Sequence, residues 1–87
     1  MLGGFVTRDH APSPRMEAGM WGKVARNGEA FWVRLDSVGE ECVSATVDNH
    51  LVRNLDLTCG QRLVLNRRCI LATVGEDERR VFVSCVA

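Results

Sequence analysis

Eighty-seven residues leave room for one hydrophobic core, so we expect a single small domain. The hydrophobic share of 46% is that of a globular protein and argues against disorder. A formal net charge of zero argues against a protein that binds nucleic acid through surplus positive charge, although ten of the eleven basic residues are arginine and only Lys23 is lysine.

The sequence also argues against a membrane-spanning or secreted protein. No apolar run approaches the roughly 20 residues of a transmembrane helix, and Arg8 interrupts the start of the chain before a signal peptide can form. We therefore expect a cytoplasmic protein with reduced thiols. No close cysteine pair predicts a zinc site, and we expect no metal and no cofactor. The cysteines are Cys42, Cys59, Cys69 and Cys85.

The first part of the chain, residues 1–19, is expected to be irregular, because glycines and prolines interrupt it. Two interpretations remain open. Ser13-Pro14 is typical of a helix start and predicts one helical turn over Arg15–Ala18. Alternatively, the chain is a disordered tail up to Met16. Phe5-Val6 has the composition of a short edge strand.

Alternating apolar residues separated by turn signals predict a β-rich domain over residues 20–87. Asn27-Gly28 is the strongest turn signal, because both residues tolerate the positive φ of a type I′ hairpin. The strand after it places Phe31, Val33 and Leu35 on one face. Six strands are expected, at Met20–Ala25, Ala30–Ser37, Cys42–Val47, Arg62–Leu65, Cys69–Val74 and Arg80–Val86.

Several connections between these strands can also be predicted. Asp48-Asn49-His50 predicts a tight bend, and Leu51–Leu57 a crossover loop with apolar anchors. Arg67-Arg68 is expected in one helical turn, and 75–79 in a charged hairpin loop. The strand at 80–86 carries apolar groups on both faces, so it is either covered or offered to a partner.

Six short strands at this chain length favour a small, strongly bent antiparallel sheet. We expect a mainly β fold, an SH3-like or OB-like barrel with one or two helical turns at most, because closure limits exposed sheet edges.

Short motifs in residues 29–74 carry a family resemblance. They are Phe31-Trp32-Val33, Val38-Gly39, Val47-Asp48-Asn49, Leu57-Thr58-Cys59-Gly60 and Val64 followed by Ile70. In these motifs the chain resembles the DUF2314 family of small bacterial proteins of unknown function. It departs from that pattern at Ala45, at His50-Leu51 and in lacking an acidic-Trp ending. The resemblance implies a β scaffold without an active site, and some relatives of such domains are immunity-type or phage-encoded proteins.

Few residues offer catalytic chemistry. His10 and His50 are the only general-base candidates near neutral pH. A nucleophilic site would pair His50 with Cys59 or Cys42, yet no nucleophile motif supports it, and a solvated turn residue is the simpler interpretation. We therefore predict that the protein is not an enzyme.

Two groups of residues are candidates for partner binding. Trp32 and Arg34 share the outer face of one strand, a composition typical of binding hot spots; in the alternative, Trp32 covers a second small core. Four further arginines predict a basic patch, and the alternative is a solvated face neutralised by nearby acids. They are Arg53, Arg62, Arg67 and Arg68.

These observations predict a non-enzymatic protein–protein interaction module. The form we expect is a small phage- or mobile-element-type inhibitor or immunity-like protein that blocks a larger partner. A homodimer is a further expectation, because a domain this small gains stability from association. The alternative is a small β-barrel nucleic-acid-binding protein, which the zero net charge and the scarcity of aromatic residues disfavour.

Overall fold

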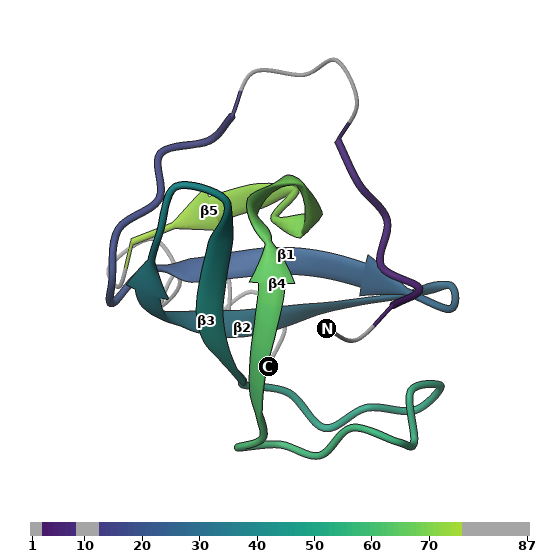
Figure 1. The fold of residues 1–87 in the computed structure, drawn as a ribbon. Coiled ribbons are helices and arrows are strands. Elements are labelled where there is room, and N and C mark those ends of the chain that lie inside the picture. Colours follow the sequence, from purple (N-terminus) through teal and green to yellow (C-terminus); the bar gives the residue numbers. More distant parts are fainter. Residues whose placement is uncertain (1–2, 9–12, 76–87) are drawn as a thin grey trace.

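A computed structural model describes residues 3–8 and 13–75 of the chain (Figure 1). This part is mainly β, as predicted, with one short 3-10 helix, η1, at Arg67–Cys69. Residues 76–79 of the hairpin loop predicted at 75–79, and the whole strand predicted at 80–86, lie outside the described residues. The strands are β1 at Trp21–Arg26, β2 at Glu29–Val38, β3 at Cys42–Val47, β4 at Arg62–Asn66 and β5 at Ala72–Val74.

The strands form one antiparallel sheet in the order β4-β3-β2-β1-β5. β2 is the long central strand that belongs to both parts of this sheet. Its first half pairs with β1 and its second half with β3, and the register shifts between Leu35 and Ser37. Such a bulge bends a strand, and in Figure 1 β3 and β4 run across β1 and β2. β4 and β5 are the two edge strands of this sheet, and the choice between an SH3-like and an OB-like barrel stays a prediction.

The concave side of the bent sheet holds the core. Alternate residues of β2, β3 and β4 are buried there, as the period of a strand requires. Gly22 of β1 lies where a Cβ atom would come within 3.1 Å of the Ile70 side chain. Ile70 therefore packs directly on the β1 backbone. The largest fully buried apolar side chains are Leu35, Leu65, Ile70, Val24, Val33, Val43 and Val47.

The N-terminal segment contributes to this core. The predicted helical turn at Arg15–Ala18 is wrong: the chain makes a turn in which the Met20 N–H donates to the Glu17 carbonyl at 3.2 Å. Met16 and Met20 are buried, and their apolar surface holds the chain against the sheet. Phe5 forms a single bridge with Arg26 where a short edge strand was considered.

The connection from β4 to β5 corrects one strand boundary. Arg67 and Arg68 lie in the predicted helical turn, but that turn extends to Cys69, so β5 begins at Ala72 and not at Cys69. The Asn66 side chain fixes the turn by accepting from the Arg68 N–H at 2.9 Å. Arg8 also holds this turn, because its Nη2 atom donates to the carbonyl of Arg67, the first residue of η1, at 2.9 Å.

Candidate functional site

The connection between β3 and β4 is the most prominent surface feature. The crossover predicted at Leu51–Leu57 is wrong, because β3 and β4 are antiparallel neighbours and residues 48–61 join them as a long hairpin loop. We keep the name crossover loop for these residues, which extend well beyond the strands in Figure 1. Val52 and Leu55 on this loop are 78% and 79% exposed, the highest values among the exposed large hydrophobic residues that the structure describes. Exposed apolar residues on an ordered segment are typical of interaction sites.

One carboxylate holds the backbone of this loop. Glu29, at the start of β2, accepts from the backbone N–H groups of Val52 at 2.8 Å, Arg53 at 3.0 Å and Asn54 at 3.1 Å. Three successive N–H groups that converge on one oxygen pair form an anion-binding concavity of the kind called a nest. The protein fills this nest with its own side chain, which fixes the loop against the β1–β2 hairpin.

Asn54 completes the attachment from the loop side. It is fully buried and is the only buried polar residue in the part of the chain that the structure describes. Its Nδ2 group donates to the Arg26 carbonyl at 2.8 Å and to Glu29 at 3.0 Å. Its Oδ1 atom accepts from Arg26 at 3.2 Å and from Asn27 at 3.0 Å. Both donors and both lone pairs are therefore satisfied, as a buried amide requires.

Arg26 links the loop to the N-terminal segment. Its side chain is only 11% exposed, and its Nη1 atom lies 2.9 Å from an Asp56 carboxylate oxygen. Its Nε atom donates to the Gly3 carbonyl at 2.9 Å, and the guanidinium lies over the Phe5 ring, 5.6 Å from the centroid. Hydrogen bonding from Arg26 lowers the pKa of Asp56. Together, Glu29, Asn54, Arg26 and Asp56 form what we call the clasp.

The hairpin turn gives the clasp its shape. Asn27 and Gly28 have φ values of 54° and 76°, as the predicted type I′ turn requires. A Cβ atom at Gly28 would lie 3.1 Å from Nη1 of Arg53. Glycine at this position therefore permits both the backbone conformation and the close approach of the loop arginine.

The clasp also depends on the protonation state of Glu29. The hydrogen bond from the Val52 N–H, with those from Asn54 and Arg53, lowers the pKa of Glu29 from 4.5 to about 2. Because the folded pKa is depressed, the stabilising contribution of Glu29 is complete above pH 4.5 and is lost as the pH falls towards 2.

A shallow depression of about 440 Å³ lies beside the exposed Leu55 side chain. Leucines form much of its lining, and the exposed residues His50 and Cys59 border it. Both members of one of the two His–Cys pairs that the sequence suggested, His50 and Cys59, therefore border the same depression. Cys42 belongs to β3 and does not line this depression. The lining residues are His50, Leu51, Leu55, Leu57, Thr58 and Cys59.

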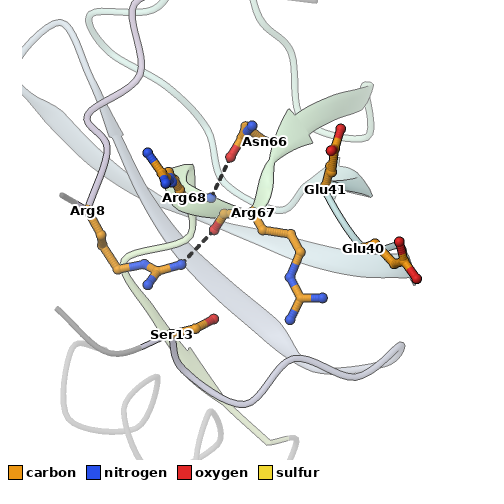
Figure 2. Close-up of a pocket in the computed structure, with 7 residues that line it drawn as sticks. All are labelled: Arg8, Ser13, Glu40, Glu41, Asn66, Arg67 and Arg68. Atoms are coloured by element: carbon orange, nitrogen blue, oxygen red, sulfur yellow. Dashed lines mark hydrogen bonds between the residues drawn. The ribbon is translucent and has the colours of Figure 1, made fainter. Parts of the chain in front are cut away.

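A second depression, of about 680 Å³, lies at η1 and is lined by charged residues (Figure 2). Arg8 and Arg67 point toward it, but each also donates to a backbone carbonyl: Arg8 to that of Ile70 at 2.6 Å and Arg67 to that of Gly39 at 2.9 Å. Glu40 and Glu41 border the same space. The mixed charge and the structural use of these arginines make this depression a weaker candidate than the crossover loop.

The predicted pair Trp32 and Arg34 lies on the outer face of β2. Across to β1, Trp32 is opposite Lys23 and Arg34 is opposite Trp21, so tryptophans and cations alternate. Trp32 is half-buried, its backbone N–H donates to the Asn49 side chain, and Arg34 is exposed. The two residues are therefore brought together, beside the start of the crossover loop.

The four arginines that were grouped by sequence do not form one patch. Arg53 is on the crossover loop beside Gly28, and Arg62 begins β4 opposite Thr46. Arg67 and Arg68 follow the far end of β4, in η1. Five residues of strand separate the two ends by about 15 Å. The binding role predicted for these arginines stays a prediction.

The sequence predicted a loop here with apolar anchors, which is right for Leu51 and Leu57 but wrong for the exposed Val52 and Leu55, and it did not predict the clasp. The available signals were a single Asn within the leucine-rich segment Leu51–Leu57 and a Glu directly after the Asn27-Gly28 turn. Neither indicates which distant backbone groups it will bind, because their proximity arises from the folded sheet.

The fold and the loop define a small β domain with one bent antiparallel sheet and one clasped loop. Comparisons with models of protein families, with curated proteins and with solved structures found no match. In the described part of the chain, no three His, Cys, Asp or Glu side chains gather to hold a metal. No helix in that part has the length and apolarity needed to cross a membrane.

Proposed function

We propose that the protein is a non-enzymatic protein-binding module and that the crossover loop is its recognition element. The observation that carries this proposal is the combination of an ordered loop backbone with exposed apolar side chains. Glu29 accepts three successive loop N–H groups, while Val52 and Leu55 on the same loop are nearly four-fifths exposed.

This combination favours binding for an energetic reason. Ordering a loop on association reduces affinity, and a loop that is already fixed avoids that penalty. Apolar side chains that leave water then contribute most of the favourable free energy, at roughly 25 cal/mol per Å² of buried apolar surface. The clasp maintains the loop conformation without burying Val52 and Leu55, which keeps them accessible to a partner.

The partner that fits this surface is a protein with an apolar side chain able to enter the leucine-lined depression beside Leu55. Trp32 and Arg34, on the sheet near the start of the loop, would border such a contact. The resemblance to DUF2314 proteins adds the expectation of an immunity-like or inhibitory role, in which occupation of a larger partner's surface is itself the activity.

The test is a binding experiment with loop variants. Immobilised protein is exposed to lysate of the native host, captured proteins are identified, and each one is purified for a binary titration. The double variant Val52→Ser/Leu55→Ser should lose the partner, with affinity reduced about tenfold or more. Val6→Ser is the matched control, because Val6 is also exposed but lies outside the loop.

Three outcomes would contradict the proposal. One is equal capture by the wild type and the loop variant. Another is loss of capture in the Val6→Ser control as well. The third is submicromolar binding to DNA or RNA in a gel shift at physiological salt, without any captured protein; that result would support the nucleic-acid alternative.

A further inference from the structure

β4 is at one edge of the sheet, and among residues 3–8 and 13–75 no strand pairs with its outer side. The direction of its backbone groups follows from the ladder with β3. The Arg67 N–H donates to the Glu41 carbonyl at 2.9 Å, and the Gln61 carbonyl accepts from the Val47 N–H at 2.8 Å. Because backbone groups alternate in direction along an antiparallel strand, those of Arg62, Val64 and Asn66 point away from β3.

Within residues 3–8 and 13–75, this edge has few of the features by which sheets normally avoid pairing with other chains. Edge strands of monomeric proteins usually carry a lysine, a proline, a bulge or an inward-pointing charge. β4 reads Arg-Leu-Val-Leu-Asn, so its protection is limited to one exposed charge, Arg62, at its first residue; it has no lysine, proline or inward-pointing charge, and its register with β3 is unbroken over all five residues. Leu63 and Leu65 point into the core, and Val64 is 52% exposed on the opposite face.

We propose that the outer edge of β4 pairs with the same edge of a second copy of this chain. The pairing is antiparallel about a two-fold axis at Val64, which makes the interface isologous. Each Val64 then exchanges both of its backbone hydrogen bonds with its counterpart. Arg62 of each copy lies opposite Asn66 of the other, where the Arg62 N–H can donate to the Asn66 carbonyl; the Asn66 N–H itself is engaged by Cys69 within the chain.

A second copy fits this edge better than an arbitrary strand for two reasons. In this register no like charges face one another, because the only charged side chain of β4, Arg62, meets the neutral Asn66. In addition, the whole chain has a formal net charge of zero, so no long-range repulsion opposes the encounter of two copies. Pairing extends the sheet across both molecules, with Leu63 and Leu65 of each copy adjacent at the junction.

The Val64→Pro variant tests this pairing selectively. The Val64 N–H points outward, so proline removes a donor to the second copy and no donor to β3. We expect the wild type to sediment as a dimer at high protein concentration. The dimer dissociation constant of Val64→Pro should be at least about tenfold higher, because the interface loses two donors. Val64→Thr, which keeps the N–H and the β-branched shape, should behave as the wild type.

Amide hydrogen exchange of the wild type provides a second measurement that does not require the proline variant to fold. Exchange at Val64 should slow as protein concentration rises, whereas exchange at Leu65, which bonds within the chain, should not depend on dimer formation through this edge. A wild type that is monomeric at every concentration would overturn the proposal. So would a folded Val64→Pro variant with undiminished dimerisation, or protection of Val64 that does not change with concentration.

Discussion

Leu35 in the sheet and Asn54 in the crossover loop are both fully buried, yet different interactions hold them. Leu35 packs among apolar side chains, and its contribution scales with the volume and area that it fills. Asn54 depends on particular donors and acceptors from Arg26, Asn27 and Glu29. The stability of the sheet should therefore not depend on protonation. The conformation of the loop, in contrast, should depend on individual hydrogen-bonding atoms and on acidic pH.

The largest expected effect is on the sheet. Leu35→Ala should lower the free energy of unfolding by about 3 kcal/mol, because it removes buried methyl groups and leaves a cavity in a well-packed core. Urea denaturation of the whole domain measures this loss. Val64→Ala, at a half-exposed position, should change stability by less than about 0.5 kcal/mol. Similar values for the two variants would show that the sheet interior does not dominate stability.

Asn54→Ala should have the next largest effect, a loss of about 2 kcal/mol. The substitution leaves the Arg26 carbonyl and other clasp groups without their buried partner, which costs about 1–3 kcal/mol. Asp56→Asn is the control, because its amide oxygen can still accept from Arg26 at an exposed position. If Asn54→Ala unfolds at the same urea concentration as the wild type, the buried amide does not hold the loop.

Gly28→Ala should destabilise the domain by about 1 kcal/mol, because alanine disfavours positive φ. The new methyl group would also displace the Arg53 guanidinium. Thermal unfolding measures the change. Gly28→Asn should lose less, because asparagine tolerates the left-handed conformation better than alanine does. Equal losses for the two variants would argue against backbone strain as the cause.

The smallest expected effect is a loss of stability that occurs only at acidic pH. Since folding lowers the pKa of Glu29 from 4.5 to about 2, wild-type stability should decline as the pH falls through this interval. Glu29→Gln removes the titrating group and should make the same part of the pH–stability curve flatter. Urea titrations at several pH values provide the measurement, and parallel curves for the two proteins would contradict the assigned role of Glu29.

The alternation of apolar residues predicted the sheet well, because one face of each strand must be buried. Asn27-Gly28 likewise predicted its turn from local conformational preference alone. The helical turn predicted at Arg15–Ala18 was wrong, because burial of Met16 against the sheet overrides a local helix-start signal. Local composition has no information on such a contact.

The candidate site, like the fold, could be predicted from the sequence only in part. The position of the crossover loop and its apolar character could be read from the sequence. The clasp could not, because Glu29 and Asn54 are 25 positions apart and meet only once the hairpin and the loop are folded. The converse holds for Arg62 and Arg67. They are close in sequence, but they lie at opposite ends of β4 because the strand is extended.

The most direct test of the clasp is amide hydrogen exchange at Val52, Arg53 and Asn54 in the wild type and in Glu29→Ala at neutral pH. The three amides should be protected in the wild type, because the Glu29 carboxylate accepts from each of them. In Glu29→Ala they should exchange much faster, while the core amide of Val33 keeps its protection. Unprotected loop amides in the wild type, or unchanged protection in Glu29→Ala, would contradict the account.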